Sequence, residues 1–235
     1  MLKRIILSPW LAIITLLVLL SIRWTDPAFV ESIRLRYFDT LITSAPVTEN
    51  NIHIVNIDEA ALDKYGQWPF GRDVYADIIT DLYARGAGLV IWNIMMPEAD
   101  RAGQDAVLAQ TLIEYPVVLP LIGADRTKNT PTNPGAVIIG DPAGKVVEYP
   151  GILSSIESLG SQAHGQGIST VFPEIDGVVR RMPLVIQSGD ILYPALGLEV
   201  LRILAGDPSF QIKFNELGIE KLRVPAFGMV TTDPI

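Results

Sequence analysis

Cysteine is absent from this 235-residue sequence, and histidine occurs only twice. Without cysteine the chain has no disulfide framework, no thiolate nucleophile and no cysteine-based metal site. His53 and His164 have no histidine partner at the spacing of metal ligands, so no zinc site is predicted. Basic residues are outnumbered, with 18 Lys and Arg against 26 Asp and Glu, and they do not cluster as phosphate contacts require. We therefore expect no nucleic-acid partner.

The common catalytic and nucleotide-binding motifs are missing as well. The sequence contains no G-x-S-x-G, no P-loop and no G-x-G-x-x-G. The sequence therefore gives no indication of a hydrolase or a nucleotide-binding protein, and no cofactor is expected. What remains is the composition of an ordinary folded protein, with 49% hydrophobic residues.

One long apolar run stands near the N-terminus. Residues 5–22 carry no charge and follow Lys3 and Arg4, and as a helix they would span about 27 Å, close to the thickness of a bilayer core. A cleaved signal peptide is the alternative, but Ser21-Ile22-Arg23-Trp24 supplies no small-x-small cleavage site. The basic residues before the run favour a cytoplasmic N-terminus. We predict a tail over residues 1–4, a helix across the cell inner membrane over 5–22, and the rest in the periplasm or extracellular space.

A second helix is predicted directly after this run. Thr25-Asp26-Pro27 is typical of a helix start, because a capping oxygen is followed by proline at the first helical position. Apolar residues then recur every three or four positions, as in an amphipathic helix. Residues 23–50 are therefore predicted to hold a juxtamembrane helix and a linker, with the apolar face packing on the domain or on a second copy in a homodimer. These apolar residues are Val30, Ile33, Tyr37 and Leu41.

The domain over residues 51–235 begins with a βαβ pattern. Residues 52–57 are rich in β-branched side chains and predict a buried strand, residues 72–85 a helix, and residues 88–94 a second strand parallel to the first. A helix over 104–115 and a strand over 116–122 repeat the pattern. The sequence thus predicts an α/β fold with a mostly parallel, doubly wound sheet.

The second half of the domain is less regular. Residues 123–150 are expected to form an excursion or edge hairpin around an apolar segment at 136–139, and residues 151–159 a short helix. Two strands over 167–172 and 178–186 are predicted to form an antiparallel hairpin, since Asp176-Gly177 between them is a turn signal. A last helix is expected over residues 193–205.

Candidate ligand-binding residues lie where the predicted parallel strands end, because open α/β sheets place ligands at that edge. Clustered carboxylates there could hold Mg²⁺ or Ca²⁺, or act as acid and base. The alternative is structural: Asp58 caps a short helix that ends at Gly66, and the other residues are solvated. No metal is predicted. The residues of this edge are Asp58, Glu59, Asn93, Glu98 and Asp100.

Two further groups are candidates for ligand contact. Trp68 and Phe70 beside Arg72 could form an aromatic and cationic pocket, although a Trp-Pro loop more often covers the end of a sheet. Arg180 and Arg181 alternate in direction on a strand, so one could pair with a carboxylate while the other meets solvent or an anionic ligand.

Several of these motifs together resemble the CHASE2 domain, an extracytoplasmic sensory module of bacterial transmembrane receptors. The resemblance covers roughly residues 25–235, and Asn93 stands where such domains usually carry Asp. The motifs are Val55-Asn56-Ile57-Asp58-Glu59, Gly66-Gln67-Trp68-Pro69-Phe70-Gly71-Arg72, Gly86-Ala87, Pro97-Glu98-Ala99-Asp100, residues 167–172, residues 176–184 and Tyr193-Pro194-Ala195-Leu196.

The resemblance implies a sensor domain that is not itself an enzyme and binds an unknown small molecule or protein. It also implies a chain that continues beyond Ile235 into a cytoplasmic adenylate or guanylate cyclase, histidine kinase, serine/threonine kinase or diguanylate cyclase. Two alternatives stay open: a scaffold that dimerises through the 26–42 helix and binds no small molecule, and an envelope enzyme that uses Asp58 and Glu98. The ligand-binding candidates are Asp58, Glu59, Trp68, Arg72, Asn93, Glu98, Arg180 and Arg181.

Overall fold

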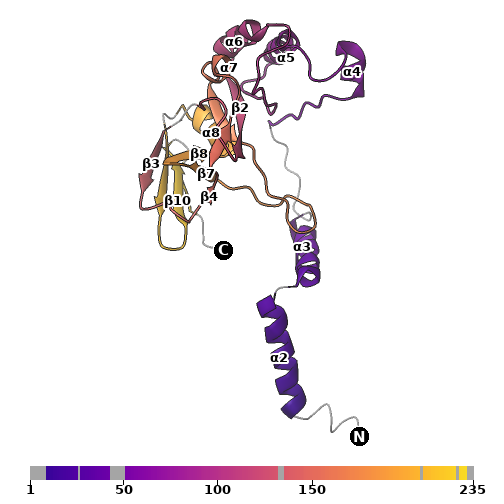
Figure 1. Cartoon of the computed structure of the whole chain (residues 1–235), viewed down its shortest axis with the longest axis vertical. Coiled ribbons are helices and arrows are strands. Elements are labelled where there is room, and N and C mark those ends of the chain that lie inside the picture. The colour runs from indigo at the N-terminus through magenta and orange to yellow at the C-terminus, as the bar shows by residue number, and fades with distance from the viewer. Residues whose placement is uncertain are drawn as a thin grey trace. The chain divides into compact units, whose positions relative to one another are not determined.

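The protein is described by a computed structural model that covers residues 9–25, 27–42, 51–131, 135–206, 209–225 and 228–231. The chain separates into two compact units (Figure 1). Unit 1 consists of Met1–Val55 and Pro173–Arg180, and unit 2 of Asn56–Phe172 and Arg181–Ile235. Both belong to a mixed α/β structure.

Unit 1 contains two helices joined by a sharp bend. Helix α2 (Pro9–Thr25) and helix α3 (Ala28–Ile42) differ in direction by 79°. Among the described residues no single helix is both long and apolar enough to cross a bilayer; only the two helices taken together reach the required length and apolar composition. The tail over 1–4, the start of the predicted 5–22 span and the linker over 43–50 lie outside the described residues.

Helix α3 lies within the predicted helical region over residues 23–50, and its apolar stripe is exposed. Leu35 is buried, and Glu31 and Arg34 form an ion pair one turn apart at 2.6 Å. The residues expected to pack inward are exposed, and Phe29 is exposed beside them. An exposed apolar stripe of this kind is typical of an interaction surface. The stripe residues are Val30, Ile33, Tyr37 and Leu41.

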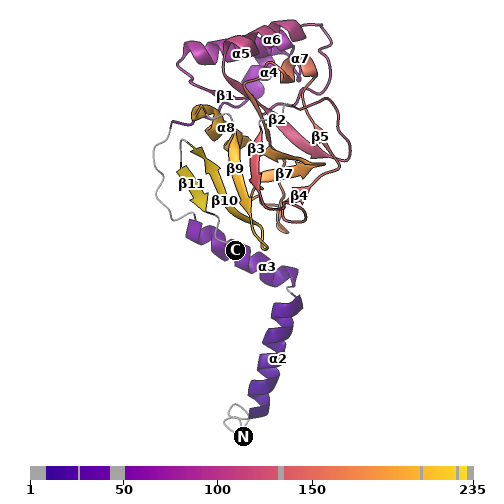
Figure 2. The ribbon, with the colours of Figure 1, turned by 90° about the vertical axis from the view of Figure 1, so that its left-hand side faces the viewer.

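Unit 2 places helices at one end of a small sheet, which Figure 2 shows clearly. Strand β2 lies at the centre and pairs in parallel with β1 and β6, and antiparallel with β5. The β1–α6–β2 crossover confirms the predicted parallel arrangement of these two strands. The elements are α4 (Glu59–Tyr65), α5 (Arg72–Ala84), β1 (Val90–Ile91), α6 (Asp105–Glu114), β2 (Val117–Ala124), β5 (Gly151–Leu153), α7 (Glu157–Gly160) and β6 (Gly165–Ile168).

The first core forms where α5 and α6 pack on this sheet. Tyr75 and Ile79 of α5, Leu108 of α6, and Val117 and Leu119 of β2 are all fully buried. Burying side chains of this size removes enough apolar surface to contribute about 1.5–3 kcal/mol each. This core fixes the ends of β1 and α5, which frame the candidate site described below.

The rest of unit 2 consists of two smaller sheets and one helix. One sheet has the order β11-β10-β9-β3, and the other β4-β7-β8. Gly165 and Gly167 of β6 lie so close to the first turn of α8 that a Cβ at Gly167 would stand 2.6 Å from the Leu196 backbone. The elements are β3 (Ala136–Ile139), β4 (Val147–Glu148), β7 (Val185–Ser188), β8 (Ile191–Pro194), α8 (Leu196–Leu204), β9 (Phe210–Phe214), β10 (Ile219–Val224) and β11 (Gly228–Thr231).

The predicted first strand is wrong. Residues 52–57 form no strand, and they are exposed along their length, with Ile54 84% accessible. Their β-branched sequence favours an extended backbone, but a strand also requires a partner, and none of the described strands pairs with them. The predicted βαβ unit therefore lacks its first strand, and its second is reduced to Val90–Ile91.

The predicted hairpin in the second half is also wrong. Asp176-Gly177 does form a tight turn, because Gly177 has φ 81° and donates to the Glu174 carbonyl at 2.8 Å. The flanking chain, however, pairs elsewhere: β6 joins β2, and β7 joins β8 in an antiparallel hairpin further along. Residues 151–159 likewise split into β5 and the short helix α7. The described strands thus form three mixed sheets rather than the predicted single doubly wound sheet.

Candidate functional site

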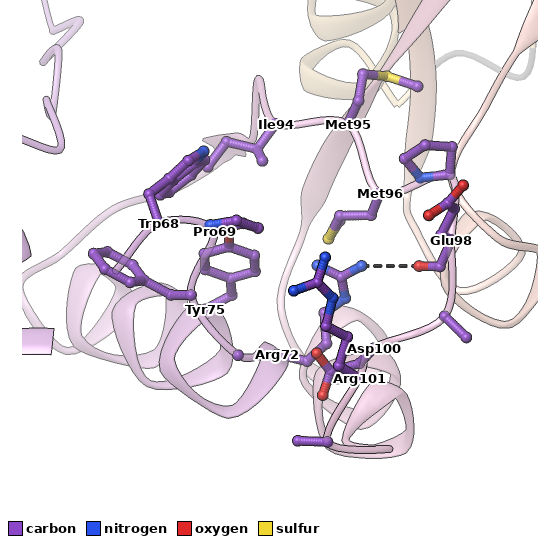
Figure 3. Close-up of a pocket in the computed structure, with 15 residues that line it drawn as sticks. Trp68, Pro69, Arg72, Tyr75, Ile94, Met95, Met96, Glu98, Asp100 and Arg101 are labelled. Atoms are coloured by element: carbon purple, nitrogen blue, oxygen red, sulfur yellow. Dashed lines mark hydrogen bonds between the residues drawn. The ribbon is translucent and has the colours of Figure 1, made fainter. Parts of the chain in front are cut away.

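A pocket of about 490 Å³ lies in unit 2 at the start of α5. The loop before α5 forms one side, and the loop that follows β1 forms the other (Figure 3). A volume of this size suits a small molecule. The lining residues are Trp68, Pro69, Phe70, Gly71, Arg72, Tyr75 and the continuous stretch from Ile94 to Ala102.

Aromatic side chains build the first side of the pocket. The Trp68 ring lies 5.4 Å from Phe70 in an edge-to-face arrangement and 5.9 Å from Tyr75. Phe70 and Tyr75 belong to the core, whereas Trp68 remains 42% exposed. The aromatic cluster therefore covers the core, as the Trp-Pro loop predicted, and also presents an indole face to the pocket.

Arg72 lies at the base of the pocket and is only 8% exposed. Its Nε donates to Asp105 Oδ1 at 3.2 Å, and its Nη2 donates to the Glu98 carbonyl oxygen at 3.0 Å. Asp105 in turn accepts from the Asp100 backbone N–H at 2.9 Å. Arg72 is thus buried with a charged partner, as a buried guanidinium requires. It joins the start of α5 to the loop after β1.

The loop after β1 is held in place from outside the pocket. The Asn129 side chain donates to the Pro97 carbonyl at 3.1 Å and to the Ser154 carbonyl at 2.9 Å. The Ile156 backbone N–H donates to the Met96 carbonyl at 2.9 Å. Asn129 adopts φ 62°, a left-handed conformation that Asn tolerates better than most residues. These bonds give the second side of the pocket a fixed backbone.

Tyr75 is the most deeply buried side chain of the lining. Burial raises the pKa of its hydroxyl, while the nearby Arg72 charge and the Phe70 backbone act in the opposite direction. The hydroxyl has no hydrogen bond of standard geometry among the described residues. The Tyr75 ring also contacts Trp92, at 5.1 Å between centroids. Tyr75 therefore connects the pocket to the core.

The pocket brings together three of the predicted ligand-binding residues, Trp68, Arg72 and Glu98. Glu98 contributes mainly its backbone, since its exposed carboxylate pairs with Lys128 at 3.0 Å, and this pair lowers the pKa of Glu98. Asp100, also placed at this edge, lines the pocket and accepts from the Gln104 backbone at 3.1 Å.

Other predicted residues lie outside the lining. Asp58 accepts from the Ala61 backbone N–H at 3.1 Å and caps α4, which ends at Gly66, so the structural alternative for Asp58 is confirmed. Glu59 and Asn93 are exposed. In the residues that the structure describes, no group of three or more His, Asp or Glu side chains is placed to hold a metal ion.

Sequence reasoning missed several residues of the lining. Tyr75 and Met96 read as ordinary core positions, and Arg101 stands one residue beyond the predicted acidic edge. Arg101 could have been predicted from its position directly after the segment Pro97 to Asp100. Nothing in the sequence indicates that Asp105, at the start of α6, meets Arg72.

Arg180 lies in unit 1 and has a different environment. Its side chain is 6% exposed and contacts carboxylates of Asp39 on α3 and of Asp176 and Glu174 in its own loop. Both guanidinium contacts to Asp39 measure 2.7 Å, which is the bidentate geometry of a strong pair. Arg181, the next residue, is exposed. Arg180 thus fastens the Pro173–Arg180 segment to α3.

The same contacts change the acidity of the cluster. The Arg180 hydrogen bond lowers the pKa of Asp176 to about 2, with a smaller contribution from the Val178 backbone N–H. The carboxylates in turn raise the pKa of Arg180. Each charge therefore stabilises the charged form of the other.

The described residues thus form a mixed α/β structure with a pocket of about 490 Å³ between the loop before α5 and the loop after β1. The family model of the CHASE2 domain matches residues 13–231. The chain therefore belongs to the CHASE2 domain family, whose members are extracytoplasmic sensory domains rather than catalysts. Neither the curated proteins nor the solved structures include one that matches this chain.

Proposed function

We propose that this chain is the input domain of a bacterial transmembrane signalling receptor. Residues 5–22 anchor it in the inner membrane, unit 2 lies in the periplasm or extracellular space, and the pocket receives the ligand. In the complete receptor a cytoplasmic cyclase, kinase or diguanylate cyclase reads the signal. The observation that carries the proposal is the family match over residues 13–231.

The structure supports a route for the signal. The chain leaves unit 2 at Phe172, is fastened to α3 by Arg180 and Asp39, and returns to unit 2 at Arg181. A change in unit 2 that pulls on this segment acts on α3, which follows directly after α2. Sensors of this kind work by shifting a population between two arrangements.

The location is tested with single cysteines, since the natural chain has none. Glu216→Cys, exposed in the β9–β10 turn, reacts in intact cells with a membrane-impermeant maleimide if unit 2 is outside. The control is a variant with one cysteine inserted directly after Met1. This cysteine is expected to react only after the cells are lysed. Labelling of Glu216→Cys only after lysis contradicts the proposal.

The sensory role is tested in the complete receptor. Removing residues 51–235 while keeping the membrane segments is expected to change the activity of the output domain severalfold. Equal output activity with and without these residues, at equal membrane levels of the protein, rules out an input role.

A second candidate function is a dimerisation scaffold that binds no small molecule. The exposed apolar stripe of α3 favours it, because an uncovered helix face of this kind is a common homodimer surface. The same stripe would join two copies of a ligand-binding receptor, so a homodimer is expected under both functions.

Crosslinking along α3 tests the scaffold. Ile33→Cys and Tyr37→Cys are expected to form intersubunit disulfides in membranes, and Ala28→Cys, exposed on the opposite side of the helix, is the matched control. Equal crosslinking at all three positions, or none in a verified oligomer, argues against this face. A scaffold without a ligand also predicts that substitutions in the pocket leave the output unchanged.

A further inference from the structure

The acidic groups around the pocket are already engaged. Asp105 accepts from Arg72, Glu98 pairs with Lys128, and Asp100 accepts from the Gln104 backbone. A carboxylate that already has a cation or an N–H donor attracts a second cation less. The pocket therefore offers few acceptors of its own to neutralise a further positive charge.

Two guanidinium groups in the pocket keep donors free. Arg101 makes no hydrogen bond or ion pair with any described residue, although it lines the pocket and is exposed to it. Arg72 donates through Nε and Nη2, and its Nη1 has no bond within the described part of the chain. Figure 3 shows both side chains between the aromatic side and the Glu98 side. A guanidinium offers five N–H donors in a flat fork that matches a carboxylate.

The side of the pocket opposite Glu98 is apolar. Trp68 presents partly exposed aromatic surface, and the half-buried Ile94 extends it toward the loop after β1, while Tyr75 and Met96 lie buried behind them. The combination of a hydrophobic wall and a few converging polar groups is the usual composition of a small-molecule site.

We infer that the pocket binds a small organic monocarboxylate, with its carboxylate on Arg101 and the free edge of Arg72 and its apolar body against Trp68 and Ile94. This inference rests on the proposed sensory function and names its ligand class. A single negative charge fits because Arg101 forms no ion pair within the described part of the chain; it acts on Glu98 only as a nearby charge, as the lowered pKa of Glu98 shows. Arg72 is nearly buried and already paired, so it orients the carboxylate rather than supplying the unbalanced charge.

The test is isothermal titration of the whole chain in detergent micelles with three matched pairs of probes. The carboxylates are phenylacetate, indole-3-acetate and 4-methylvalerate, and each is compared with its own primary amide. At least one carboxylate is expected to bind about tenfold more tightly than its amide, the effect of one charge-assisted contact. Acetate, which has the charge without the apolar body, is expected to bind more weakly than all three.

The variant Arg101→Gln is expected to weaken the carboxylate about tenfold and to leave the amide unchanged. Arg85→Gln, on an exposed arginine at the end of α5, is the matched control and binds like the wild type. Trp68→Leu is expected to weaken the carboxylate and the amide alike. Equal melting temperatures of these variants show that the fold is kept.

Three results overturn the inference: no carboxylate binds, each carboxylate binds no better than its amide, or Arg101→Gln binds like Arg85→Gln. In the last case Arg101 is a solvated surface residue. These results leave the proposed function standing, because that function is judged by the output activity of the receptor without residues 51–235 and not by these probes.

Discussion

Arg180 and Arg101 are two arginines of one chain in opposite environments. Arg180 has a buried side chain and meets carboxylates of Asp39, Glu174 and Asp176, whereas Arg101 is exposed in a pocket and meets none among the described residues. A guanidinium surrounded by acidic groups holds parts of the protein together. One that is left with free donors beside an apolar wall is available to a ligand. The same residue type thus serves as a joint in unit 1 and, in the proposed binding mode, as a recognition group in unit 2.

Arg180→Ala is expected to have the largest effect. Three carboxylates are then left close together without their cation, so they repel each other and the segment separates from α3. Amide hydrogen exchange over residues 174–180 is expected to become faster by about tenfold or more. Arg101→Ala is the control and leaves this exchange unchanged.

Replacing one carboxylate at a time separates the contact of Arg180 with α3 from its contact with the turn. Asp39→Asn removes the contact on α3 but leaves the turn bonded to Arg180, and Asp176→Asn does the reverse. Unchanged exchange in Arg180→Ala and in both of these variants would make Arg180 a surface residue like Arg101, and the comparison would fail.

Arg72→Gln is expected to have the next largest effect, because Arg72 lies between the two cases. It lines the pocket like Arg101 but is nearly buried and paired like Arg180. Loss of its bonds to Asp105 and the Glu98 carbonyl is expected to destabilise the fold by about 1–3 kcal/mol in urea unfolding. Arg85→Gln serves as the exposed control. If Arg72→Gln lowers the free energy of unfolding no more than Arg85→Gln does, Arg72 makes no structural contribution and resembles Arg101.

Acid is expected to open the joint over a narrow pH range. The folded-state pKa of Asp176 is about 2, below its ordinary value of 3.8, because of the Arg180 hydrogen bond. The stabilisation is therefore fully present above about pH 4 and is lost as the pH falls toward 2. Carbon NMR of the Asp176 carboxyl group measures its pKa, which is expected to be about 2 in the wild type and closer to 3.8 in Arg180→Gln. A wild-type value near 3.8 would show that the pair does not form in solution.

Arg101→Gln is expected to have the smallest effect on stability. Exposed substitutions without partners change the free energy of unfolding by about 0.5 kcal/mol or less, so the melting temperature should move by about 2 °C at most. Differential scanning calorimetry checks this value. A clear loss of stability would show that Arg101 has a structural partner and is not reserved for a ligand.

Elements that are specified locally could be predicted from the sequence. Helices α3, α5 and α6 follow from periodic apolar residues, and β1 and β2 are parallel as the crossover required. The turn at Asp176-Gly177 also forms as its sequence indicates. These features depend on backbone preferences within a few residues, and such preferences can be read from one sequence.

Features that depend on a distant partner could not be predicted. The β-branched residues 52–57 have a strand sequence but no described partner strand, and the strands beside Asp176-Gly177 pair with other strands rather than with each other. Arg180 and Asp39 are 141 residues apart, so no local spacing indicates their pairing. Part of the pocket lining was predicted because the Trp68 loop and Glu98 belong to recognisable motifs, whereas Tyr75 and Arg101 do not.

Under the proposed function, Asn129 offers a way to adjust ligand affinity from outside the pocket. The amide of this residue spans the Pro97 and Ser154 carbonyls, yet Asn129 does not line the cavity. A substitution there loosens one wall while every group that touches the ligand keeps its identity. In the proposed binding mode, ligand affinity can therefore change separately from chemical selectivity.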